Sequence, residues 1–175
     1  MRGLFLKRMP RKIVFQSLVS ILAIFLIFFP LNFLILSLES GKIISCWRVT
    51  PKELFTLAYI HSVAKSEVRE IFQVGSAGQI ILVETHFQGQ GTGLPYNLSG
   101  SEKLYRKGDW FYLQNMQRVI PAILWRVQSA YQNRFFFRGQ EINFSLKINN
   151  GLIRIEIKKM SPFKWAMAYL QNLLK

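Results

Sequence analysis

The chain has 175 residues, half of them hydrophobic, and a formal net charge of +14. This length fits one domain of ordinary size plus an appendage. Its single cysteine excludes an internal disulfide, no Cys/His spacing typical of a metal site occurs, and the scattered basic residues accompany no nucleic-acid-binding motif. We therefore expect no cofactor and no nucleic-acid partner.

Residues 13–38 form the first recognisable element, a run without a charged residue. As a helix this run would extend roughly 39 Å, which is enough to span a hydrocarbon core of about 30 Å with some tilt. Pro30 lies within the run, and proline is tolerated in membrane helices. We therefore predict a transmembrane anchor at 13–38, with a cleaved signal peptide as the alternative.

The charges before this run predict its orientation. Residues 1–12 contain five basic residues and no acidic one. Positive charge is retained on the cytoplasmic side, so this segment is predicted as a cytoplasmic tail and the main domain as extracytoplasmic. The expected location is the cell membrane, crossed once.

Residues 43–175 are predicted as the extracytoplasmic domain, joined to the anchor by a short hinge at 39–42. Short runs rich in β-branched and aromatic residues alternate with Gly- and Asn-containing turns, which is typical of an antiparallel β-sandwich or barrel. The predicted strands are residues 43–49, 54–63, 67–74, 80–87, 110–114, 123–131, 134–138, 141–148 and 152–158.

Two signals near the C-terminus predict further elements. The alternating segment 144–157 has Asn150-Gly151 at its centre, which favours a hairpin with a type I′ turn pairing Phe144 with Ile157. A helix is predicted at about 161–174, because Ser161 suits the N-cap and the proline after it suits the first helical position.

The segment Tyr59-Ile60-His61-Ser62-Val63 contains one of only two histidines. Pairing the strand at 54–63 with the strand at 67–74 across a four-residue loop places His61 opposite Glu70, on a face that is otherwise apolar. A further pairing with the strand at 80–87 adds Glu84 and gives a row across three strands, although a shift of one residue would send Glu84 to the other face.

This row could have a structural or a chemical role. An imidazole with two carboxylates can bind a divalent cation or exchange protons, whereas a satisfied His–Glu pair can simply fix the strand register. Ser62 is not expected to act as a nucleophile with His61, because adjacent strand residues point to opposite faces. We therefore predict no catalytic residue.

A glycine-rich loop follows the third of these strands. Its residues permit a backbone shape that larger side chains would forbid, but they match neither a dinucleotide-binding nor a P-loop motif. It is interpreted either as a tight crossing or as a contact loop for a ligand or partner. The loop residues are Gly91, Thr92, Gly93, Leu94 and Pro95.

The order of these features resembles a bacterial family, a domain of unknown function, whose members are often encoded beside TRAP transporters of the TAXI type. The resemblance runs from the anchor to the C-terminal helix. The residues that carry it are Phe55, Leu57, Tyr59, Ile60, His61, Ser62, Val63, Val68 and Glu70, the loop Gly91–Pro95, and Asn115, Met116, Arg118, Arg126 and Val127.

The resemblance implies a small membrane-anchored extracytoplasmic protein linked to ion-coupled uptake of organic acids. We therefore expect a non-enzymatic accessory protein that contacts the membrane subunit or the substrate-binding protein of a TRAP transporter. Residues 39–175 carry a net charge of +9, which suits an acidic partner or anionic headgroups. The alternative is a module, or an enzyme, that binds a small ligand or divalent cation at His61 and Glu70.

Overall fold

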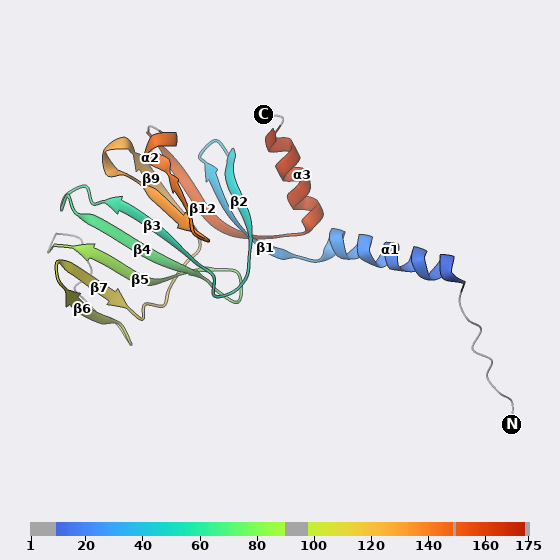
Figure 1. Ribbon diagram of the computed structural model, residues 1–175, viewed down its shortest axis with the longest axis horizontal. Helices are drawn as coiled ribbons and strands as arrows, with labels where there is room; N and C mark the ends of the chain where they lie inside the picture. Colours follow the sequence, from blue (N-terminus) through green and yellow to red (C-terminus); the bar gives the residue numbers. More distant parts are fainter. Residues whose placement is uncertain (1–9, 90–97, 149, 174–175) are drawn as a thin grey trace, which may run out of the picture. The chain divides into compact units, whose positions relative to one another are not determined.

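The computed structural model describes residues 10–89, 98–148 and 150–173. The chain divides into two compact units, one at Asn32–Lys158 and one formed by Met1–Leu31 with Lys159–Lys175. The predicted fold class is confirmed, because antiparallel strands dominate and are accompanied by one apolar N-terminal helix and a short C-terminal helix (Figure 1).

The unit formed by the two ends contains helices α1 (Arg11–Phe28) and α3 (Pro162–Leu173). The predicted cap of α3 is confirmed, since Ser161 Oγ accepts a hydrogen bond from the Lys164 N–H at 3.3 Å. Helix α1 is long and apolar enough to cross a membrane, and a helix of this kind serves either as an anchor or as a signal sequence.

The predicted helical span at 13–38 is wrong in its second half. Helix α1 ends at Phe28, and Phe29 has an extended backbone. The residue before a proline is driven out of the helical region, so Pro30 explains this end. At 18 residues α1 is about 27 Å long, close to the hydrocarbon thickness.

Residues Leu31–Leu38 form strand β1 instead of continuing the helix. The strand lies between β2 (Ile43–Val49) and β12 (Asn150–Met160) in a four-stranded sheet of order β2-β1-β12-β9, whose last strand β9 spans Ile123–Gln128. Its residues from 33 to 37 are all buried, which explains a sequence that carries no charge and is apolar from Phe33 to Leu36. The β domain therefore begins near residue 32 rather than 43, and the predicted hinge at 39–42 is the turn of a β-hairpin.

The second sheet has eight strands. Its main path follows the order β11-β10-β3-β4-β5-β7-β6, and β8 pairs with the first part of β5. The strands of this sheet are β3 (Leu54–Ile60), β4 (Glu67–Val74), β5 (Ile80–Gln88), β6 (Lys103–Lys107), β7 (Trp110–Gln114), β8 (Arg118–Ile120), β10 (Arg134–Phe137) and β11 (Gln140–Asn143).

The two sheets share one hydrophobic core, which makes the domain a sandwich. Trp47 of β2 stacks on Phe135 of β10 with 5.6 Å between ring centroids, so aromatic contacts join the sheets. From the other end of the smaller sheet, Trp125 of β9 (Ile123–Gln128) contacts Phe144 edge to face. The sheet faces toward this core are called inner below, and the opposite faces outer.

The predicted hairpin across Asn150-Gly151 is wrong. Residues Phe144–Lys147 form a helical turn, α2, and Asn150 already belongs to β12, where it pairs with Gln128 of β9. Asn143 caps α2 by accepting a hydrogen bond from the Leu146 N–H. The cap and the burial of Phe144 outweigh the turn preference of Asn-Gly.

A buried asparagine next to α2 stabilises this arrangement. Asn133 is 2% exposed, its Oδ1 accepts from the Gln128 N–H, and its own N–H donates to Ser145 Oγ at 2.7 Å. Ser145 Oγ in turn donates to the Gln128 carbonyl. These bonds connect the end of β9 to α2.

Candidate functional site

His61 lies in the turn that joins β3 to β4, not in a strand. Its N–H donates to the Ser66 carbonyl at 2.8 Å, and its Nδ1 accepts from the N–H groups of Val63 and Ala64 at 3.3 and 3.1 Å. These bonds close a turn at 61–66, two residues longer than predicted. The imidazole therefore organises the turn and is not opposite Glu70.

Glu70 lies opposite Leu57 of β3 and Thr85 of β5, on the inner face of the eight-stranded sheet. The prediction that it shares an apolar face is confirmed, but its predicted partner is wrong. Burial raises the pKa of Glu70 to about 7. Burial, and then the negative charge of Glu70, raise the pKa of the Tyr59 hydroxyl. No described residue donates a hydrogen bond to this carboxyl.

The predicted row His61–Glu70–Glu84 does not exist. Strand β5 has an irregularity opposite Ile71 and Phe72, which pair with Glu84 and Leu82 and leave Val83 between them. This bulge turns Glu84 to the outer face. There Glu84 Oε2 accepts from Gln114 Nε2 at 3.1 Å and lies 2.8 Å from His86 Nε2.

The outer face of this sheet gathers aromatic and basic side chains in a single cross-strand row. From β6 to β4, the residues paired in turn are Tyr105, Tyr112, His86 and Arg69. Tyr105 and Tyr112 stack at 5.0 Å, and Tyr112 contacts the His86 ring at 4.6 Å. The Arg69 guanidinium lies over the Trp110 ring, 5.2 Å from its centroid. We call these five residues the aromatic–arginine strip.

A depression of about 260 Å³ adjoins the strip. Thr56 and Ile71 lie opposite each other in β3 and β4, and Phe136 of β10 lies opposite Thr56. Arg69 and His86 lie opposite each other in the neighbouring row and complete the lining. The depression therefore has an apolar part and a basic part.

The sequence prediction missed the strip and the depression. Strand periodicity puts Trp110 and Tyr112 on one face and Phe111 and Leu113 on the other, but all four are apolar or aromatic, so the sequence alone did not show which pair faces outward. Which strands lie side by side was not identifiable, and that adjacency is what assembles the site.

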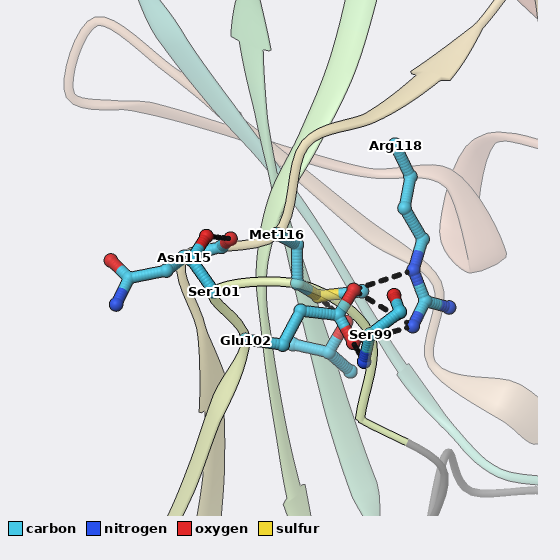
Figure 2. A network of polar contacts seen from close by, with 7 residues as sticks. Ser99, Ser101, Glu102, Asn115, Met116 and Arg118 are labelled. Carbon is cyan, nitrogen blue, oxygen red and sulfur yellow. Dashed lines mark hydrogen bonds and ion pairs between the residues drawn. The ribbon is translucent and has the colours of Figure 1, made fainter.

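A second polar network joins the segment 99–102 to residues 115–118 (Figure 2). Arg118 binds Glu102 in a two-pronged ion pair, with Nε to Oε1 and Nη2 to Oε2 both at 3.0 Å. The Ser99 N–H also donates to Glu102, and together with Arg118 it lowers the pKa of this 4% exposed carboxyl. The pair fixes the segment 99–102 against β8.

The neighbouring motif residues support the same region. Asn115 has a left-handed backbone, with φ of 59°, and its carbonyl accepts a hydrogen bond from Ser101 Oγ. Met116 is fully buried, and its N–H donates to the carbonyl of Val83 in the bulge of β5. Asn115, Met116 and Arg118 therefore hold the crossing from β7 to β8 in place.

The remaining predicted residues contribute less to a site. Ser62 is exposed in the turn after His61, and Arg126 is exposed on β9, which belongs to the other sheet from the strip. The loop residues Gly91–Pro95 lie outside the described residues. Within the described part of the chain, no three His, Cys, Asp or Glu side chains are grouped so that they could hold a metal ion.

Comparison with known proteins gives a family match. The model of the family described as Domain of unknown function (DUF1850) matches residues 55–144, from β3 to the start of α2. The matched region contains the aromatic–arginine strip and the Glu102–Arg118 pair. No curated protein and no solved structure matches the chain.

Proposed function

Since the chain belongs to the DUF1850 family, whose function is unknown, we propose from its own surface that it is a non-catalytic accessory protein, held at the membrane, that docks on a solute transporter. The observation that carries the proposal is the aromatic–arginine strip on the outer face of the larger sheet. The transporter class comes from the resemblance to a family encoded beside TAXI-type TRAP transporters, so the partner is a membrane subunit or a substrate-binding protein of that type.

The composition of the strip favours a protein partner. Trp, Tyr and Arg are the residues most enriched among those that dominate binding energy in protein interfaces. Tyr105 is 44% exposed and the Arg69 side chain 48% exposed, so both are accessible from solution. Lys103 and Lys107 lie beside Tyr105 on the edge strand β6, in the place where an interface has its polar rim.

The charges define the complementary surface. The domain is strongly basic, and the Arg69 guanidinium is held between Glu67 and the Trp110 ring. A partner surface with carboxylates around an apolar centre would match it. Attachment through α1, with the β domain outside the cytoplasm, would hold this surface next to a transporter in the same membrane.

The absence of catalysis is part of the proposal. His61 is engaged in its own turn, and Glu70 faces the core on the other side of the sheet from Glu84 and His86. The matched family carries no assigned activity. The residues predicted to form one row thus lie apart, His61 in a turn, Glu70 on the inner face and Glu84 on the outer face, which favours binding over acid–base chemistry.

Co-purification from native membranes tests the proposal. Full-length tagged protein at near-native levels in mild detergent is expected to retain a transporter component, identified by mass spectrometry. The variant Tyr105→Ala is expected to lose most of this component, because it removes an exposed ring of the strip.

The matched control is Tyr131→Ala, in the short turn Ser129–Tyr131, which lies outside the strip. This variant is expected to retain the component at the wild-type level. Wild-type protein that brings no transport component, or equal retention by both variants, would contradict the proposal.

A further inference from the structure

The geometry points to a small-molecule site in the depression beside the strip, for a monocarboxylate with a compact apolar body. The site goes beyond the proposed docking function and does not depend on it. Its parts are Thr56, Ile71 and Phe136 on one side and Arg69 and His86 on the other.

The apolar part of the depression arises from the sheet register. Phe136, Thr56 and Ile71 are cross-strand neighbours in β10, β3 and β4, so their side chains form one outward row. Phe136 and Ile71 supply apolar surface, and Thr56 supplies one hydroxyl. A ring or branched chain of a ligand would bury its surface there.

The basic part is formed by the next row. There Ala58 lies between Arg69 and Arg134, and its methyl group is fully buried beneath this part of the surface. Glu67 Oε1 accepts from Arg69 Nε at 3.0 Å and from Arg134 Nη2 at 2.7 Å. Two guanidinium groups thus share one carboxylate, which leaves one positive charge in excess.

Arg69 is positioned before any ligand arrives. Its Nε is bound to Glu67 and its Cζ lies over the Trp110 ring, while no described residue accepts a hydrogen bond from its terminal nitrogens. A guanidinium matches the planar, two-oxygen geometry of a carboxylate. Fixing the cation in advance reduces the ordering cost of binding.

The charge and the volume of the depression restrict the charge and the size of its ligand. Arg69, Arg134 and Glu67 leave one positive charge, while Glu84, opposite Ile71 and beside His86, repels any further negative charge, so the site suits a monoanion better than a phosphate or dicarboxylate. The volume of about 260 Å³ is below the ~300–1,000 Å³ of drug-sized sites, so the body must be small. The shared chemistry is a carboxylate on an apolar group, which can be a free acid or the C-terminal end of a polypeptide.

Binding to the full-length protein in nanodiscs tests this site, with empty nanodiscs as the blank. The probes are benzoate, its neutral analogue benzamide, acetate, and N-acetylphenylalanine as a mimic of a chain end. Benzoate is expected to bind at least tenfold more tightly than benzamide or acetate. Benzamide lacks the negative charge that Arg69 binds, and acetate lacks the apolar ring that packs against Phe136 and Ile71. In wild-type protein, contacts between benzoate and Phe136 ring protons are expected by NMR.

Arg69→Gln is expected to weaken benzoate binding about tenfold or more. The matched control is Arg154→Gln, because Arg154 is also bound through Nε to a glutamate two residues away and is also about half exposed. Should Arg69→Gln not fold, Phe136→Leu is the second variant, with an expected loss of the ring contacts and severalfold weaker binding.

The outcomes separate the sources of the carboxylate. Binding of benzoate identifies a free small acid, and binding of N-acetylphenylalanine alone identifies a chain end. Failure of both probes to bind, equal binding of benzoate and benzamide, or equal effects of Arg69→Gln and Arg154→Gln would overturn the site. None of these results depends on capture of a transporter component, so the two proposals fail separately.

Discussion

The two faces of the eight-stranded sheet treat the same residue type in opposite ways. Glu70 on β4 faces the core, where burial raises its pKa to about 7 and no described residue bonds to it. Glu84 on the neighbouring strand faces outward and contacts both Gln114 and His86. Burial on the inner face thus disfavours the ionised form of Glu70. On the outer face, Glu84 instead contacts the imidazole of His86 and positions it.

Aromatic residues show the same contrast. Inner rings such as Phe135, Phe55 and Phe72 are buried in the core, and Phe135 packs against Trp47 of the other sheet. The outer rings stack on each other and on cations, as Trp110 does with Arg69. We therefore expect inner substitutions to change stability and outer substitutions to change binding.

The largest expected effect is at Phe135, which can be compared with its neighbour on β10. Phe135→Ala would leave a cavity in the core and is expected to lower the free energy of unfolding by about 3–5 kcal/mol. Phe136→Ala, on the outer face, would lose mainly the contact with Arg134 and cost about 1 kcal/mol. Denaturant unfolding of both variants measures the difference, and similar losses would show that the outer face is also packed.

The division into faces could be predicted from the sequence. Alternation correctly placed Leu57, Tyr59, Val68, Glu70 and Phe72 on one side. The predicted register was nevertheless wrong, because the turn at 61–66 is longer than assumed. The observed register differs from the predicted one by an even number of residues. The assignment of residues to faces is therefore correct, although the predicted pairing of His61 with Glu70 is wrong.

Other features could not be predicted because the same local pattern allows two structures. An apolar run such as Leu31–Leu38 fits both a membrane helix and a buried strand, and only Pro30 marks the boundary. The bulge at Val83, which turns Glu84 outward, has no glycine to signal it. The Asn150-Gly151 pair favours a turn, but tertiary contacts of Asn133 and Ser145 place α2 before it.

The second prediction concerns the pH dependence of stability. The folded pKa of Glu70 is raised from 4.5 to about 7, so the group is protonated in the folded state while it is already ionised in the unfolded state. The contribution of protonated Glu70 to the free energy of unfolding is fully present below pH 4.5. It falls by about 3 kcal/mol as the pH rises to 7. Above pH 7 no further loss from this group is expected.

Glu70→Gln would remove this loss, because an amide stays neutral. At pH 5 the variant is expected to unfold near the wild-type temperature, and at pH 8 on the order of 10 °C higher. Thermal unfolding at a series of pH values measures the effect, with Glu84→Gln as the control that leaves Glu70 in place. If the unfolding temperatures of wild type and Glu70→Gln changed with pH in parallel, ionisation of Glu70 would not destabilise the fold. The contrast between the two faces would then not hold.

The smallest expected effect is on the outer face, at the contact of Glu84 with His86. The two side chains are 34% and 22% exposed, so solvent screens their interaction. A double-mutant cycle with Glu84→Gln and His86→Gln, measured by denaturant unfolding at pH 7, is expected to give a coupling below about 1 kcal/mol. A coupling well above that value would mean that the pair stabilises the fold, and the outer face would then be a structural network like the inner one. A small coupling, together with weaker benzoate binding in His86→Gln, would instead show that the pair serves to position the imidazole.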